Sequence, residues 1–170
     1  MSAIIAYFSR AGGNYVRGEI KDLCKGNTET AAEIIQKLTG ADLFKIEPIC
    51  EYSSDYSKCI DEAKQDKCRG ARPELKAYPG SIDKYDTVYL GYPNYWGTMP
   101  MAVFTFLEKY DFTGKTIKPF CTHEGSGMGS SENDIKNACP AAKVKRGIAI
   151  YGSRAEESES DIKKWLIKAE

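Results

Sequence analysis

The sequence is poor in metal-ligating residues and carries no net charge. It contains one histidine, His123, and six cysteines, none of them in C-x-x-C spacing. Zinc and iron–sulfur sites are built from several such ligands at close spacing, so we expect no metal centre. The 24 basic and 24 acidic side chains cancel. Because nucleic acids and membrane surfaces attract strongly basic proteins, we expect neither among the partners of this chain.

Long apolar runs and targeting signals are also missing. No run approaches the roughly 20 apolar residues that a transmembrane helix needs. The first residues enter a strand-like run without the regions of a signal peptide. We therefore expect a cytoplasmic protein whose cysteines stay reduced. A length of 170 residues, with 42% hydrophobic and 28% charged residues, is typical of one soluble globular domain, which we expect over 1–170.

Short apolar runs alternate with helical patterns along the whole chain. The runs predict strands over 3–8, 43–46, 87–90, 116–121 and 144–151. Apolar residues at spacings of three and four predict helices over 30–38 and 102–110, with weaker helical patterns over 57–66 and 135–139 and a final helix whose core face is Ile162, Trp165, Leu166 and Ala169. This alternation indicates an α/β fold with a parallel sheet covered on both faces. Right-handed crossovers bring its strand-to-helix loops to one edge, where such sheets bind ligands.

The loop after the first predicted strand has the composition of a phosphate site. It begins with Ser9 and Arg10 and reaches Asn27 and Thr28 at the start of the next helix. Free backbone N–H groups and the helix dipole favour an anion there. The alternative is that Asn27 or Thr28 simply caps the helix. No Walker motif and no G-x-G-x-x-G follows the strand, which argues against nucleoside triphosphates and dinucleotides.

The loop after the third predicted strand is rich in aromatic residues, glycine and proline. It reads Gly91-Tyr92-Pro93-Asn94-Tyr95-Trp96-Gly97-Thr98-Met99-Pro100. Tyr95 and Trp96 offer a stacking face to a flat ligand, and Gly97 is suited to present its backbone to that ligand. The alternative is a rigid turn whose aromatic side chains cover the core.

The loop after the fourth predicted strand is rich in glycine. It runs from Thr122 to Ser131 with glycine at 125, 127 and 129, so its backbone can approach a ligand closely. The alternative is a flexible connection. His123 in this loop is more typical of packing than of catalysis, and we assign no catalytic residue. A flat heteroaromatic ring with one phosphate arm would satisfy all three loops, and flavin mononucleotide (FMN) is the obvious candidate.

The chain resembles flavodoxins, especially a bacterial flavodoxin-like branch with a G-Y-P-N-[WY]-W-G-T-M-P loop, here Gly91 to Pro100. The runs Pro119 to Gly127 and Thr39 to Phe44 are also similar to that branch. The resemblance covers nearly the whole chain. It implies a flavodoxin-like three-layer sandwich, with a five-stranded parallel sheet in order 2-1-3-4-5, helices on both faces and a non-covalent FMN.

The resemblance also implies a role for each matching position. The FMN phosphate would be held by Ser9, Arg10, Asn27 and Thr28. The isoalloxazine ring would be contacted by Pro93, Asn94, Tyr95, Trp96 and Gly97, and its other side and pyrimidine end by Thr122, His123, Glu124, Gly125, Ser126 and Gly127. Usual flavodoxins have a compact phosphate loop, whereas here Ala11 to Gly26 intervenes. We expect this insertion either to cover the flavin or to shape a pocket for a second ligand.

Two functions fit these features. The favoured one is a redox carrier that passes electrons through its flavin between partner proteins. The alternative is an NAD(P)H-dependent FMN oxidoreductase acting on quinones or similar small acceptors. Carriers of this family are usually acidic, which steers them to basic partners, so zero net charge weakens the first function. The absence of a nicotinamide-nucleotide signature weakens the second. A binding or sensing module without turnover is disfavoured because the phosphate and aromatic loops are both intact.

Overall fold

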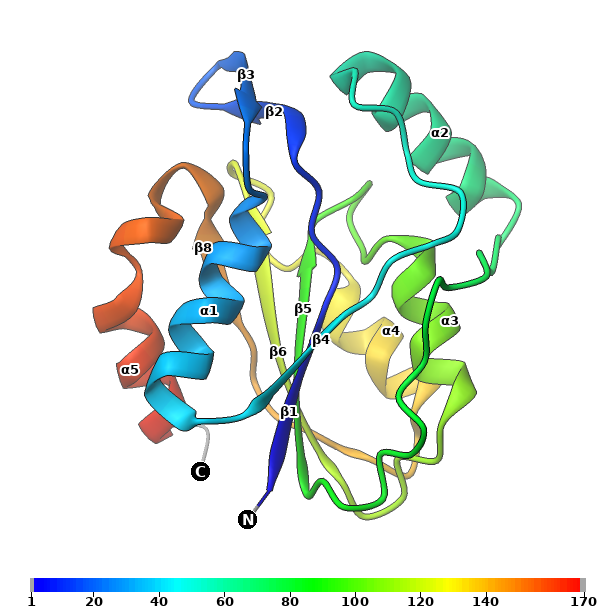
Figure 1. Cartoon of the computed structure of the whole chain (residues 1–170), viewed down its shortest axis with the longest axis vertical. Coiled ribbons are helices and arrows are strands. Elements are labelled where there is room, and N and C mark those ends of the chain that lie inside the picture. Colours follow the sequence, from blue (N-terminus) through cyan, green and yellow to red (C-terminus); the bar gives the residue numbers. More distant parts are fainter. Residues whose placement is uncertain (1, 169–170) are drawn as a thin grey trace.

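A computed structural model describes residues 2–168 of the chain as a parallel sheet between two layers of helices (Figure 1). The strands of the sheet are β1 (Ala3–Tyr7), β4 (Asp42–Lys45), β5 (Thr87–Pro93), β6 (Thr116–His123), β7 (Lys143–Val144) and β8 (Ile148–Tyr151). They run in the order β4-β1-β5-β6-β7, β8 also pairs with β6, and every pairing is parallel. Since β7 and β8 share the place of the fifth predicted strand, the predicted order 2-1-3-4-5 is confirmed.

The fifth predicted strand, 144–151, is interrupted because its register against β6 shifts. Ile117 pairs with Val144, whereas Phe120 pairs with Ile148. Three residues, 145–147, therefore oppose two residues of β6, as in a β-bulge. Gly147 lies at this point, where a Cβ atom would approach the carbonyl oxygen of Pro119 to 2.8 Å. The single predicted strand is thus two short strands, β7 and β8.

Helices cover both faces of the sheet. On one face lie α1 (Asn27–Thr39) and α5 (Glu159–Lys168), and on the other lie α3 (Met101–Lys109) and α4 (Ser131–Ala138) (Figure 1). Alternate residues of β1 explain why two layers form, because Ile5 packs against α1 and α5 whereas Ile4 packs against α3 and α4. Ala169, predicted on the core face of the last helix, lies outside the described residues.

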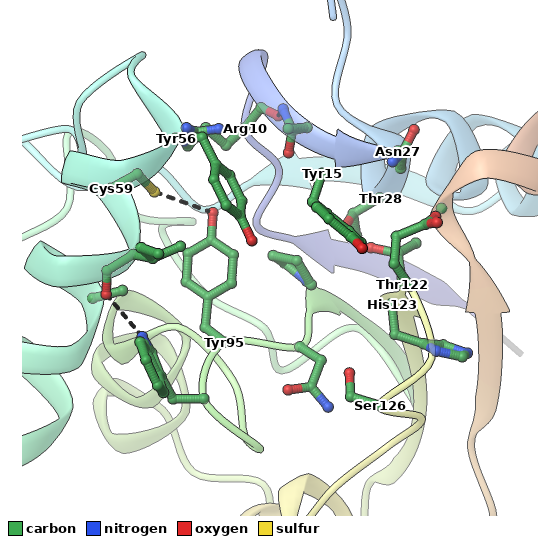
Figure 2. Close-up of a pocket in the computed structure, with 18 of the residues that line it drawn as sticks. Arg10, Tyr15, Asn27, Thr28, Tyr56, Cys59, Tyr95, Thr122, His123 and Ser126 are labelled. Atoms are coloured by element: carbon green, nitrogen blue, oxygen red, sulfur yellow. Dashed lines mark hydrogen bonds between the residues drawn. The ribbon is translucent and has the colours of Figure 1, made fainter. Parts of the chain in front are cut away.

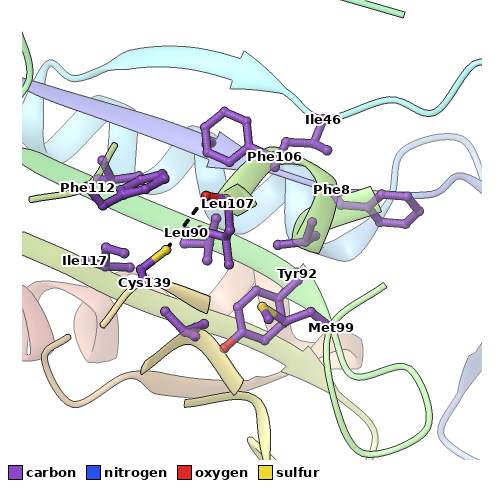
Figure 3. Close-up of a cluster of buried hydrophobic side chains, with 14 of the residues drawn as sticks. Phe8, Ile46, Leu90, Tyr92, Met99, Phe106, Leu107, Phe112, Ile117 and Cys139 are labelled. Atoms are coloured by element: carbon purple, nitrogen blue, oxygen red, sulfur yellow. Dashed lines mark hydrogen bonds between the residues drawn. The ribbon is translucent and has the colours of Figure 1, made fainter. Parts of the chain in front are cut away.

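The core beneath α3 and α4 contains most of the large buried side chains (Figure 3). Phe106 and Leu107 of α3 and Phe112 after it pack onto Leu90 and Ile117 of the sheet. Burying side chains of this size contributes roughly 1.5–3 kcal/mol each. This core fixes the positions of β5 and β6, and therefore of the loops at their carboxyl ends.

Two elements rise beyond the carboxyl ends of the strands (Figure 1). One is the antiparallel hairpin of β2 (Gly12–Val16) and β3 (Glu19–Leu23), and the other is α2 (Tyr56–Cys68). The hairpin occupies the insertion Ala11 to Gly26, for which no structure was predicted. Its two turn residues, Arg17 and Gly18, have φ of 51° and 89°, the sign that a type I′ turn requires at both positions.

Helix boundaries differ from the predictions by a few residues. α1 begins at Asn27, three residues before the predicted start, because Gly26 ends the extended segment and the polar first turn lies outside the apolar pattern. Within residues 2–168, no helix is both long and apolar enough to cross a membrane. The cytoplasmic location and the single domain stay predictions.

Candidate functional site

A cavity of about 430 Å³ opens at the carboxyl ends of β1, β5 and β6 (Figure 2). Its size is within the range of small-molecule sites. The strand-end loops and the following turn contribute Ser9, Arg10, Asn27, Thr28, Pro93, Asn94, Tyr95, Trp96, Gly97, Thr122, His123, Glu124, Ser126 and Gly152. The hairpin and α2 contribute Asn14, Tyr15, Tyr56, Cys59, Ile60 and Ala63. The predicted convergence of the three loops is therefore present.

Two of the predicted site residues do not line the cavity, namely Gly125 and Gly127. The carbonyl of Gly127 instead accepts a hydrogen bond of 2.8 Å from Asn94 Nδ2. Gly125 donates its N–H to His123 Nδ1 at 2.8 Å. The two glycines therefore hold two side chains that line the cavity, those of Asn94 and His123. The remaining predicted residues line the cavity themselves.

The N-terminus of α1 reaches the cavity with a glycine at the N-cap. This residue, Gly26, has no side chain with which to cap the helix, and a side chain of the preceding loop, Ser9, meets the first turn instead. The alternative in which Asn27 or Thr28 caps the helix is therefore wrong. Ser9 Oγ accepts from the backbone N–H of Glu29 at 3.0 Å. A Cβ atom on Gly26 would lie 2.1 Å from Ser9 Oγ, so only glycine fits this close approach.

Hydroxyl groups join the first loop to the third. Thr28 Oγ1 lies 2.7 Å from Thr122 Oγ1, in a buried hydrogen bond. The two residues stand at the start of α1 and near the end of β6. Together with Ser9 and the N-terminus of α1, they give this part of the cavity several neutral hydrogen-bonding groups and a favourable dipole for an anion.

Asn94 holds the second loop against the third. Its backbone N–H donates to the Thr122 carbonyl at 2.9 Å, and its Oδ1 accepts from the N–H of Gly97 at 2.9 Å. With the bond from Asn94 Nδ2 to Gly127, the backbone N–H, Oδ1 and Nδ2 of Asn94 all have partners in the second and third loops. The aromatic residues of the loop are thereby placed relative to β6.

Trp96 adopts an unusual backbone conformation that α2 stabilises. Its φ is 55°, in the left-handed region that bulky residues rarely occupy. Its Nε1 donates to the Ile60 carbonyl at 2.8 Å, and its carbonyl accepts from Lys67 Nζ at 2.5 Å. The ammonium of Lys64 also lies 5.0 Å from the ring centroid. Trp96 is nevertheless 44% exposed, so these contacts hold a large aromatic side chain at the mouth of the cavity.

Tyr95 is more enclosed than Trp96. Its ring makes edge contacts with Phe8 at a centroid distance of 5.9 Å, and its hydroxyl lies 3.8 Å from Cys59 Sγ. Burial raises the pKa of Tyr95 and also that of Cys59. Both groups are therefore neutral at physiological pH.

The charged lining residues are engaged by other parts of the protein. The guanidinium of Arg10 donates to the carbonyl oxygens of Gly13, at 2.7 and 2.8 Å, and of Ser53, at 3.2 Å. The carboxylate of Glu124 accepts the N–H of Arg17, at 3.1 Å, and that of Ser153, at 2.6 Å. The contacts of Arg10 and Glu124 with FMN stay predictions, because these side chains have structural partners already.

His123 borders the cavity as an uncharged side chain. Its ring packs on Tyr151 with centroids 4.5 Å apart. Burial lowers the pKa of His123, against the opposing charge of Glu124. Because Nδ1 accepts the Gly125 N–H, the proton of the neutral ring resides on Nε2.

The sequence interpretation missed the residues from the hairpin and α2. We call Tyr15, Tyr56, Cys59, Ile60 and Ala63 the upper wall. In Figure 2, Tyr15 and Tyr56 enter the cavity from the hairpin and α2, opposite Ser126. The rings of Tyr15 and Tyr56 stack with centroids 6.3 Å apart. A partial signal for the hairpin was present, since Gly18 separates two short runs that contain the β-favouring residues Tyr15, Val16 and Ile20.

The flavodoxin family model matches residues 21–169. The chain belongs to the flavodoxin family. This match confirms the predicted family, whereas the narrower branch inferred from the aromatic loop stays a prediction. A search of curated proteins found no match.

Solved structures of similar fold cover nearly the whole chain. A Bacteroides eggerthii protein assigned as a flavoprotein is 29% identical over 99% of this chain and 97% of its own, with a TM-score of 0.80. One from Bacteroides uniformis is 26% identical over 95% and 97%, with a TM-score of 0.75. A Lactobacillus acidophilus flavoprotein in complex with FMN is 20% identical over 97% and 98%, with a TM-score of 0.65. The last likeness shows the fold alone.

Proposed function

We propose that this chain binds FMN without a covalent bond and transfers electrons through it. The observation that carries the proposal is the N-terminus of α1, whose N-cap is a glycine and which meets a hydroxyl pair and two aromatic residues in one cavity. An anionic arm and a flat ring are the two parts of FMN that these features suit. FMN is also the ligand of the Lactobacillus flavoprotein of the same fold.

The donor set fits the cofactor. Ser9, Asn27 and Thr28 would hold the phosphate with neutral donors and the first backbone N–H groups of α1, since Arg10 is occupied by carbonyl groups. Tyr95 and Trp96 would contact the ring. When bound, FMN supplies the one- and two-electron chemistry that these side chains lack.

Affinity for FMN tests the first part of the proposal. We expect Thr28→Val to weaken FMN binding about tenfold, or about 1.4 kcal/mol, because it removes a buried hydroxyl at the phosphate end. Thr105→Val is the matched control, since Thr105 bonds only within α3, to the Met101 carbonyl. Titration of the flavin-free protein with FMN, followed by flavin fluorescence, measures both. A wild-type chain that binds no FMN, or equal affinities of the two variants, would contradict the proposal.

The electron donor and acceptor belong to the same proposal. A partner protein would suit a carrier, and the zero net charge of the chain removes the electrostatic steering that acidic carriers use. The second candidate, an NAD(P)H-dependent reductase of small acceptors, is favoured by the upper wall, which adds a second, aromatic side to the cavity. Anaerobic titration of the FMN-loaded protein with NADPH separates the two. Rapid bleaching of the flavin supports the reductase, and a flavin reduced only by dithionite or a reductase protein supports the carrier.

A further inference from the structure

The upper wall differs in chemistry from the rest of the cavity. Its side chains offer aromatic and aliphatic surface, and its polar groups are two tyrosine hydroxyls and one thiol. The hairpin also contributes Asn14 to the cavity, and the Asn14 amide donates to the Arg10 and Gly12 carbonyls. The upper wall is built by the hairpin and α2, outside the three strand-end loops that suit FMN. The cavity thus has one polar and one largely apolar side.

The upper wall itself contains no Lys, Arg, Asp or Glu side chain. The charged residues that line the rest of the cavity, Arg10 and Glu124, are opposite in sign and hydrogen-bonded to backbone groups. Burying a ligand charge against side chains that offer no ionic partner costs several kcal/mol. The upper wall therefore favours an uncharged ligand.

Exposed aromatic side chains stand on both sides of the cavity mouth. Tyr15 is 43% exposed and Trp96 44% exposed. The left-handed conformation of Trp96 costs roughly 1–3 kcal/mol, and its bonds to Ile60 and Lys67 of α2 offset that cost. Strain concentrated at the mouth of a cavity indicates a binding role. The stacked rings of Tyr15 and Tyr56 add a second flat surface.

We propose that the upper wall and Trp96 form a second subsite, which binds an uncharged planar ring of the quinone class beside the flavin. This inference rests on the proposed function and identifies its acceptor as a small molecule. Two-electron-reduced FMN, when bound, would supply the two electrons and two protons that convert the quinone to the hydroquinone, and would itself be left oxidised.

The test uses tetramethyl-1,4-benzoquinone, because its fully substituted ring cannot arylate the thiols of the chain. Equilibrium dialysis measures its binding to the oxidised, FMN-loaded protein, where no electron transfer occurs. We expect Tyr15→Ala and Tyr56→Ala each to weaken quinone binding about fivefold, the effect of losing one aromatic contact. A probe in which sulfonate replaces one methyl group is expected to bind at least about tenfold more weakly.

Ile20→Ala is the matched control on the hairpin. Ile20 pairs with Tyr15 across the two strands and is exposed, but it does not line the cavity. We expect Ile20→Ala to leave the quinone affinity within about twofold of the wild-type value. We expect Ile20→Ala, Tyr15→Ala and Tyr56→Ala each to keep the FMN affinity within about twofold of the wild-type value. FMN affinity is measured first in each variant.

Three results would overturn the subsite. The first is no quinone binding by the FMN-loaded wild type, and the second is equal quinone affinity in the tyrosine variants and Ile20→Ala. The third is a loss of affinity for FMN rather than for the quinone in the tyrosine variants. The last would mean that the wall covers the flavin itself. If the wild type binds no FMN, the proposed function fails separately. Dialysis of the flavin-free chain then decides the subsite, which is supported by quinone binding that Tyr15→Ala weakens and overturned by no binding.

Discussion

The two sides of the cavity are fixed in different ways. The strand-end loops bond directly to one another, as Thr28 does to Thr122 and Asn94 to Gly127. The hairpin side of the upper wall is attached at its base through Arg10 and at its tip through Glu124. The three strand-end loops, which we call the floor of the cavity, are therefore held in place by the sheet and by one another. The hairpin is held by a few polar bonds. This difference teaches that a wall can be added to the cavity by a segment none of whose residues belongs to either hydrophobic core.

The floor is expected to respond most strongly to added volume. A Cβ atom on Gly129 would lie 2.1 Å from the Gly97 carbonyl oxygen, at a φ of 56°. We expect Gly129→Ala to lower the free energy of unfolding by about 3 kcal/mol, through backbone displacement added to strain. Gly18→Ala is the control in the hairpin, because its φ is 89° but nothing lies within 4 Å of its Cβ position. It should cost about 1 kcal/mol. Urea denaturation measures both, and equal losses would show that the floor is no more tightly packed than the hairpin tip.

The hairpin is expected to loosen when its base loses Arg10. Arg10→Gln removes the donors to the Gly13 and Ser53 carbonyls, at a cost of about 2 kcal/mol. We expect amides of residues 12–23 to exchange hydrogen at least about tenfold faster while the amides of the sheet change little. Hydrogen exchange with mass spectrometry resolves the two regions.

Arg154→Gln provides the control for that substitution. The Arg154 side chain is 64% exposed and pairs only with Glu157, at 3.6 Å. Exposed pairs of this kind contribute about 0–1 kcal/mol, so hairpin exchange should stay as in the wild type. Faster exchange throughout the sheet in Arg10→Gln would mean that the hairpin and floor unfold as one unit.

The smallest expected effect is the contribution of His123, a residue of the floor, to the pH dependence of the free energy of unfolding. Burial lowers the pKa of His123 below its usual value of 6.5, so the unfolded chain binds the proton more readily. The stability contributed by neutral His123 is therefore present above pH 6.5 and is lost as the pH falls below that value. We expect the wild type to lose more stability than His123→Gln between about pH 7.5 and 5.5. Parallel urea titrations measure this, and identical pH profiles would show that His123 does not titrate differently on folding.

The strands and most helices could be predicted because each has a local pattern. The run Ala3–Phe8 is apolar on both faces, as a central parallel strand requires. The hairpin was harder to predict from the sequence, because its strands are short and largely exposed and therefore lack a clear apolar pattern. Its turn is Arg17-Gly18, in place of the more recognisable Asn-Gly.

The site was predictable where its residues follow strand ends. Crossover handedness alone brings Ser9, Asn94 and Thr122 to one edge, and these residues do line one cavity. The partners of individual side chains were not predictable. Arg10 was expected at a phosphate, yet its donors meet the carbonyl of Gly13, three residues further on, and that of Ser53. Only the folded chain brings Ser53 near Arg10.

The sequence by itself determined the strands of a parallel sheet and the three converging loops, because periodicity and chain handedness are local properties of the chain. The strand order followed from the resemblance to flavodoxins. The tertiary structure decided the upper wall, the left-handed Trp96 and the engagement of Arg10 and Glu124. These features depend on contacts between segments far apart in sequence, such as Trp96 with Ile60 and Glu124 with Arg17. Their geometry follows from packing and hydrogen-bond satisfaction in the folded chain.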